Sequence, residues 1–177
     1  YASESGCYRA ASDIQNRIED FKSDGKSPQE SELKGLEEYA IECSIIKVFC
    51  SEAMQNSSDE GVQIFGGMGF SADTPMEAAW RDSRIGRIYE GTNEINRMVS
   101  VGMLLKKAAK GHLDLMNPIM QIVEKVKSNK FEKLNDNSEF AQEEFLVQNI
   151  KDIFLLLTGA AFQKYGADLE NHQMVLL

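Results

Sequence analysis

The chain has 177 residues, 42% hydrophobic and 27% charged, which is enough for the core of one ordinary domain or of two small helical ones. Its formal net charge of -9 argues against a nucleic-acid-binding protein, because that binding depends on Lys and Arg displacing phosphate counterions. Cys7, Cys43 and Cys50 have no metal-ligand spacing, and we expect them to be reduced. Since the chain starts at Tyr1 without Met and ends in an apolar run, we expect it to be a fragment of a larger protein.

The apolar runs of the sequence are short. The longest, Ile153–Phe162, falls below the roughly 20 residues that cross a bilayer, and no charged start with an apolar stretch marks a signal peptide. We therefore predict a soluble protein without a membrane-spanning segment.

The first third of the chain is predicted to be helical. Residues 1–21 have a helix-compatible composition, and Gly25 lies in the break that follows. Ser27-Pro28-Gln29-Glu30 then has the residues of a capping box with a proline at the first helical position, so a long helix is predicted from there to about Ile64. Its apolar stripe is expected to be core and consists of Leu36, Ala40, Cys43, Ile46, Cys50 and Met54.

A turn and a short helix are predicted next. Gly66 and Gly67 are expected to end the long helix, because glycine adopts the left-handed conformation of helix ends, and residues 70–73 are expected to be a loop. Thr74-Pro75-Met76-Glu77 repeats the capping-box pattern before a short helix through Trp80.

Three more helices complete the prediction. Thr92 is an N-cap candidate for a helix that ends between Lys106 and Gly111. An amphipathic helix is expected over residues 115–126 and another over residues 140–165, with the polar stretch 128–138 between them. We find no convincing strand and no internal repeat, and the predicted fold is an all-α helical bundle with additional C-terminal helices.

Glu90 is the leading candidate for chemistry. It follows the apolar pair Ile88-Tyr89, which would partly shield the carboxylate from water and make it a better base, and it precedes Gly91, which permits close substrate approach. The alternative is an ordinary solvated glutamate, the commonest state of this residue.

Other motifs have simpler interpretations. Residues 67–72 match the dinucleotide pattern G-x-G-x-x-A, but the preceding segment is predicted to be a helix and not the required strand, so a helix end and turn is favoured. Arg81, Arg84 and Arg87 bind a phosphorylated ligand or, as we favour, pair with acids. His112 and His172 are isolated, so no metal site is predicted.

Two sequence segments resemble a known family. QIFGGMGF, followed by RDSRIGRIYEGTNEINR, is similar to the C-terminal signature of the acyl-CoA dehydrogenases, flavoenzymes that oxidise fatty acyl thioesters. The resemblance implies an N-terminally truncated C-terminal helical bundle over residues 1–111. Residues 112–177 resemble, more loosely, the additional C-terminal helical region of very-long-chain-type members, here truncated.

The resemblance also implies roles for residues. Glu90 looks like the base that removes the α-proton of the acyl-CoA while FAD takes the β-hydride, and its backbone amide would bind the thioester carbonyl beside Tyr89 and Gly91. Thr92 and Glu94 match the loop that contacts FAD of the same subunit. The turn that matches the contact with FAD of a neighbouring subunit comprises Gln63, Ile64, Phe65, Gly66 and Gly67. Where some relatives have an arginine that holds the CoA, this chain has Gly102.

The partners follow from the same resemblance. We expect acyl-CoA as substrate, an electron-transfer flavoprotein as electron acceptor, and a homodimer or homotetramer, located in the cytoplasm of a bacterium or in the mitochondrial matrix of a eukaryote. The fragment alone is expected to be inactive. Residues 113–177 are expected to self-associate instead of binding a membrane, since they lack a Lys/Arg-rich face. The alternatives are an acyl-CoA oxidase and a non-catalytic helical oligomerisation module.

Overall fold

The computed structural model describes residues 1–129 and 138–176, and within them every regular element is helical. This confirms the predicted all-α class. The described chain forms two compact units, unit 1 (Tyr1–Met103) and unit 2 (Leu104–Leu176), and helix α6 (Asn93–Ala109) begins in the first and ends in the second. Most of the predicted polar stretch 128–138 lies outside the described residues, and the division into domains at residue 111 stays a prediction.

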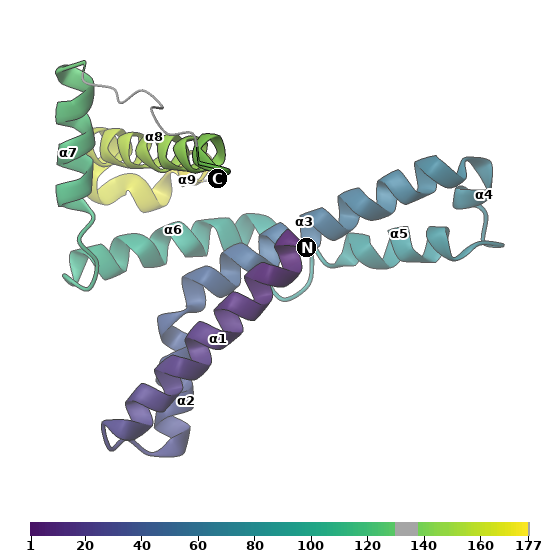
Figure 1. Cartoon of the computed structure of the whole chain (residues 1–177), viewed down its shortest axis with the longest axis horizontal. Helices are drawn as coiled ribbons and strands as arrows, with labels where there is room; N and C mark the ends of the chain where they lie inside the picture. Colours follow the sequence, from purple (N-terminus) through teal and green to yellow (C-terminus); the bar gives the residue numbers. More distant parts are fainter. Residues whose placement is uncertain (130–137, 177) are drawn as a thin grey trace. The chain divides into compact units, whose positions relative to one another are not determined.

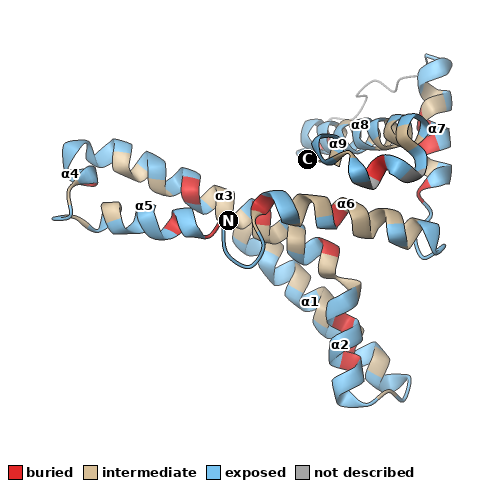
Figure 2. Ribbon diagram, turned by 180° about the vertical axis from the view of Figure 1, so that it is seen from behind, coloured by how far each residue is buried: buried red, intermediate tan, exposed pale blue. Residues whose placement is uncertain are grey.

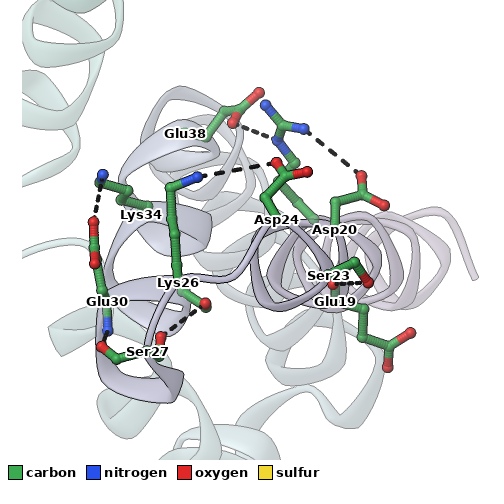
Figure 3. A network of polar contacts seen from close by, with 11 residues as sticks. Glu19, Asp20, Ser23, Asp24, Lys26, Ser27, Glu30, Lys34 and Glu38 are labelled. Atoms are coloured by element: carbon green, nitrogen blue, oxygen red, sulfur yellow. Dashed lines mark hydrogen bonds and ion pairs between the residues drawn. The ribbon is translucent and has the colours of Figure 1, made fainter.

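Unit 1 begins with two helices that lie side by side, α1 (Ala2–Ser23) and α2 (Pro28–Glu38) (Figure 1). The two helices approach closely at Gly35, where an added Cβ would lie 2.5 Å from Cγ1 of the buried Ile18. The Ser27 hydroxyl accepts from the Glu30 amide at 3.2 Å, which confirms the predicted N-cap. The Glu30 carboxylate binds Lys34 at 2.7 Å (Figure 3).

The predicted long helix is in fact two helices, α2 and α3 (Ala40–Phe65), which meet at Tyr39. Tyr39 has φ -100° and ψ 17°, and its N–H bonds to the carbonyl of Glu37, so the regular hydrogen-bond ladder is interrupted there. The predicted apolar stripe was also wrong as a core. Leu36 and Met54 are 55% and 50% exposed. The buried residues of α3 are spaced by seven: Ile41, Val48 and Gln55. Most of α3 is exposed or intermediate (Figure 2).

Helix α3 packs against α1 in its first half and against α5 (Pro75–Ile85) in its second (Figure 1). The sulfur atoms of Cys7 and Cys50 lie 3.7 Å apart at the first contact. At the second, the Trp80 indole donates to Asp59 at 2.9 Å. Helices α1 and α5 therefore cover successive halves of α3.

The end of α3 is as predicted, since Gly66 has φ 61°. A short helix that was not predicted, α4 (Gly67–Phe70), follows directly. Thr74 stands at the N-cap of α5 as expected, but the predicted capping bond was wrong, because the Thr74 hydroxyl donates to the Met68 carbonyl at 2.6 Å. The threonine thus ties the loop to α4.

Unit 2 contains α7 (Met116–Lys127), α8 (Ala141–Tyr165), the 3-10 helix η1 (Gly166–Asn171) and α9 (Gln173–Leu176). These confirm the two amphipathic helices predicted after residue 111. Helices α7 and α8 approach closely at Gly159, where an added Cβ would lie 2.6 Å from Ile119. The core of the unit consists of Leu115, Ile119, Ile122, Ala141 and Leu169.

Helix α8 is more apolar than its longest uninterrupted run suggested. One stretch of this 25-residue helix has a mean hydropathy of 1.4, so by length and composition α8 is able to cross a membrane. Helices in soluble cores meet the same criteria, although the apolar stretch of α8 is not buried within this chain. The exposed large apolar side chains of α8 are Leu146, Val147, Ile150, Ile153, Phe154 and Leu157.

Candidate active site

The loop between α5 and α6 holds Glu90 in an unusual backbone conformation. Glu90 has φ 54° and Gly91 has φ 83°, so two successive residues are left-handed. For Gly91 this conformation is easy, whereas for Glu90 it brings the Cβ close to the following carbonyl and is unfavourable. The surrounding contacts must therefore hold the loop in place.

The carbonyl of Gly91 is held by two side chains. The ammonium nitrogen of Lys47, on α3, donates to this oxygen at 2.7 Å. The side-chain amide of Asn96, in the first turns of α6, donates to it at 2.8 Å and to the Thr92 carbonyl at 3.1 Å. The peptide between Gly91 and Thr92 is thus tied to α3 and to α6.

Asn93, the first residue of α6, is completely buried and connects the loop to α3. Its backbone N–H donates to the Arg87 carbonyl at 3.1 Å. Its side-chain oxygen accepts from Lys47 at 2.8 Å, and its NH2 group donates to the Ser51 hydroxyl at 3.0 Å and to Glu52 at 3.2 Å. Every polar atom of this buried amide therefore has a partner.

Glu52 extends the network to an ion pair with Arg97, with 2.6 Å between the two side chains. Partial burial disfavours the charged carboxylate, but hydrogen bonds from Arg97 and Asn93 and the positive charges of Arg97 and Arg87 outweigh it. The net result is a Glu52 pKa below its ordinary value. A chain of contacts therefore runs from the loop through Asn93 to the ion pair of Glu52 and Arg97.

Thr92 and Glu94 form the start of α6. The Thr92 hydroxyl oxygen accepts from the Ile95 amide at 3.3 Å, as predicted for an N-cap. The Glu94 carboxylate accepts from its own amide and from the Thr92 hydroxyl, and these bonds lower its pKa. The two residues thus cap the helix that begins next to Glu90.

Shielding of Glu90 by its apolar neighbours was predicted wrongly. Ile88 and Tyr89 are themselves 48% and 52% exposed, and Glu90, which follows them, is exposed as well. Exclusion of water from this carboxylate would need atoms from outside this chain.

Most of unit 1, including this loop, matches a known protein family. The sequence model described as "Acyl-CoA dehydrogenase, C-terminal domain" matches residues 2–104, which is more than half of the chain. The chain belongs to the acyl-CoA dehydrogenase family.

Individual relatives agree with this assignment. A "Probable acyl-CoA dehydrogenase" of Bacillus subtilis (strain 168) is 40% identical over 177 residues, 100% of this chain and 30% of the relative. The human "Very long-chain specific acyl-CoA dehydrogenase, mitochondrial" is 48% identical over 65 residues, 37% of this chain and 10% of that protein. The crystal structure of an acyl-CoA dehydrogenase complexed with FAD from Bacillus anthracis superposes with a TM-score of 0.92 at 41% identity, covering 99% of this chain and 30% of that one. The chain therefore spans less than a third of its Bacillus relatives.

The turn predicted to contact FAD of a neighbouring subunit lies elsewhere on unit 1. Its residues, 63–67, are exposed where α3 ends, and added Cβ atoms at Gly66 and Gly67 would meet nothing within 4 Å. Gln63 lies roughly 24 Å along α3 from Lys47, at 1.5 Å per residue. The structure thus does not bring this turn and Glu90 together within one chain.

The three signature arginines differ in their contacts. Among the described residues Arg84 makes no ion pair, and the buried Nε of Arg87 has no hydrogen-bond partner. Arg81 pairs with Glu77 one turn earlier, as favoured from the sequence, and Arg87 contributes its carbonyl and its charge to the loop network. No group of His, Cys, Asp and Glu able to hold a metal ion occurs in the described residues.

Sequence reasoning missed Lys47, Ser51 and Asn96. The first two lie about 40 residues before the loop, in a helix interpreted only by its apolar stripe. No motif marks these residues in the sequence. Their one signal is that a lysine and a serine interrupt an apolar helical run, which indicates polar partners on that face of α3.

Proposed function

We propose that this chain forms the proton-abstracting part of an FAD-dependent acyl-CoA dehydrogenase, which oxidises fatty acyl-CoA thioesters between the α and β carbons. The carboxylate of Glu90 is the base. The observation that carries this proposal is the exposed Glu90 on a left-handed loop that is fixed by contacts on both sides, in a chain of this family. A surface glutamate without a role would not need such support.

The reaction places two demands on the loop. An α-proton next to a thioester is only weakly acidic, so the base must be positioned and the carbonyl must be polarised as the proton leaves. Within the described residues the Glu90 amide donates no hydrogen bond to the protein, so it is available to the thioester oxygen. Glu90 would thus act twice, through its side chain as base and through its N–H as a hydrogen-bond donor.

FAD, when bound, supplies the acceptor for the β-hydride. Thr92 and Glu94 would hold the cofactor of the same subunit beside Glu90. The turn from Gln63 to Gly67 would contact the cofactor of a neighbouring subunit, because its open backbone suits a close ligand approach and its distance from the Glu90 loop is too large for one contact surface. This arrangement requires a homodimer or homotetramer.

The complete enzyme would need the parts of its relatives that this chain does not cover. Those parts would supply the rest of the acyl-CoA pocket and exclude water from Glu90, and reduced enzyme would pass electrons to an electron-transfer flavoprotein. The 177 residues alone would be inactive.

Substitution of the base is the decisive test. A complete subunit is made by placing this chain in the matching part of the Bacillus anthracis enzyme, and Glu90→Gln is compared with Glu60→Gln, an exposed glutamate of α3. Glu90→Gln should lower turnover of acyl-CoA by more than about 100-fold with FAD still bound by its visible absorbance. Full activity of Glu90→Gln would refute the proposal and favour a non-catalytic oligomerisation module.

The electron acceptor separates a dehydrogenase from an acyl-CoA oxidase. After reduction with substrate, we expect slow reoxidation in air and fast reoxidation by electron-transfer flavoprotein in stopped-flow absorbance. Fast reoxidation by oxygen alone would identify an oxidase.

A further inference from the structure

We propose that Lys47 is a positioning residue for Glu90, a role that rests on the proposed function. Its ammonium group lies between the carbonyl of Gly91, at 2.7 Å, and the side-chain oxygen of Asn93, at 2.8 Å. One cation therefore joins the carbonyl of Gly91, the residue after the base, to the buried residue that starts α6.

The backbone of the loop explains why such a residue is needed. Glu90 is a non-glycine residue at φ 54°, a conformation that an unsupported loop leaves easily. The direction of the Glu90 side chain depends on this torsion. A group that holds the carbonyl of Gly91, one residue on, therefore also restrains where the Glu90 carboxylate lies.

The position of Lys47 in the fold makes it a firm anchor. It lies within α3, next to buried Val48, and Ser51 and Glu52 of the same helix bind the same Asn93. Three residues on successive turns of α3 thus contact the first residue of α6. The loop is held against the helix that forms the centre of unit 1.

Asn96 is a second, partial anchor. It donates to the same Gly91 oxygen at 2.8 Å, but it belongs to α6 and moves with the helix that follows the loop. Lys47 alone connects this oxygen to α3 among the described residues. Removing Lys47 should therefore loosen the loop without releasing it completely.

The first experiment measures the loop directly, in this chain and without cofactor. Residue-resolved amide hydrogen exchange is compared for wild type, Lys47→Met and Lys34→Met. The last is a matched control, because Lys34 makes a 2.7 Å ion pair with Glu30 on the exposed face of α2. The amides of Tyr89 and Asn93, which bond to the carbonyls of Ile85 and Arg87, are the probes.

We expect these two amides to exchange at least about tenfold faster in Lys47→Met, with α1 and α2 unchanged and Lys34→Met like wild type. Equal exchange in all three proteins would overturn the proposal. If Lys47→Met does not fold, Lys47→Gln is used under the same criterion, since its shorter amide does not span both oxygens.

The second experiment uses the complete subunit described above. In Lys47→Met the rate of flavin reduction by bound acyl-CoA should fall by about 10–100-fold, because small displacements of a reacting group have effects of this size. The dissociation constant of the substrate should change less than about threefold. Lys47→Arg, which keeps the charge and several donors, should recover most of the rate.

The outcomes separate the two proposals. An active Glu90→Gln refutes the proposed function. An inactive Glu90→Gln together with a Lys47→Met that matches Lys34→Met in reduction rate refutes the positioning role alone. A lower rate in Lys47→Met that Lys47→Arg does not recover also refutes it, since general loss of packing would then explain the defect.

Discussion

The two units of the chain are stabilised by different kinds of buried residue. Unit 2 buries aliphatic side chains, and no buried polar residue occurs in its described part. Unit 1 buries three apolar side chains, Ile18, Ile41 and Val48, together with polar residues. The buried polar residues of unit 1 are Ser31, Gln55, Ser83, Asn93 and Ser100.

This difference corresponds to what each unit has to fix. Apolar contacts are non-directional and tolerate small rearrangements, whereas buried hydrogen bonds are directional and costly to break. A loop that holds Glu90 in a left-handed conformation depends on directional hydrogen bonds more than on buried apolar area. The buried polar residue Asn93 and its partners provide these hydrogen bonds in unit 1.

The largest loss of stability is expected from the core of unit 2. Ile119 is 5% exposed and packs against Gly159 of α8, so Ile119→Ala should lower the free energy of unfolding by about 3 kcal/mol through lost burial and a cavity. Urea denaturation followed by circular dichroism measures this. The neighbouring Met120→Ala, at a 58% exposed side chain, should change it by less than about 0.5 kcal/mol. Equal effects would show that α7 does not pack as described.

A smaller loss is expected at the polar centre of unit 1. Asn93→Ala leaves the buried partners of its side chain without hydrogen bonds and should cost about 2 kcal/mol. Trp80, the single tryptophan, lies in unit 1, so its fluorescence during urea denaturation reports this unit.

The control for that substitution is Asn56→Ala, at an exposed position of α3. This control accounts for the stability that alanine adds through its higher helix propensity. The comparison between the units fails if both asparagine variants unfold at the same urea concentration.

The smallest effect is a pH dependence at Glu52. Its pKa is lowered below the ordinary 4.5 in the folded chain, so its charged form stabilises the fold above that pH and this contribution disappears as the pH falls through the folded-state pKa. Glu52→Gln should therefore lower the melting temperature at pH 7, and its difference from wild type should shrink as the pH is lowered below 4.5. Glu60→Gln controls for the loss of one negative charge on α3. A difference that stays constant with pH would contradict the ion pair as its source.

Much of the fold could be predicted because helix ends are coded locally. Ser27 before Pro28 and the glycines Gly66 and Gly166 mark real ends, since capping hydroxyls and left-handed glycines act within a few residues. The pattern failed where distant packing decides. The break at Tyr39 has no glycine or proline to announce it, and the buried face of α3 is set by the helices on either side.

The site was predictable only in part for the same reason. Glu90 and Gly91 were identified from their order in the sequence, whereas Lys47, which holds Gly91, and Ser51, which binds Asn93, lie on another helix. Glu90 also has a backbone torsion that no composition rule assigns to a glutamate. Partners that meet only through tertiary packing leave no periodic signal.

Helix α3 has a further consequence for how this chain can vary. It carries the loop anchor at Lys47 and the glycine turn at Gly66 on one rigid rod, and each inserted residue would rotate one end against the other by about 100° and lengthen the rod by about 1.5 Å. A gain or loss of a single residue within that span would swing the turn to another side of the helix. Length in this segment is therefore constrained more tightly than side-chain identity, and homologues should differ there by substitution instead of by insertion or deletion.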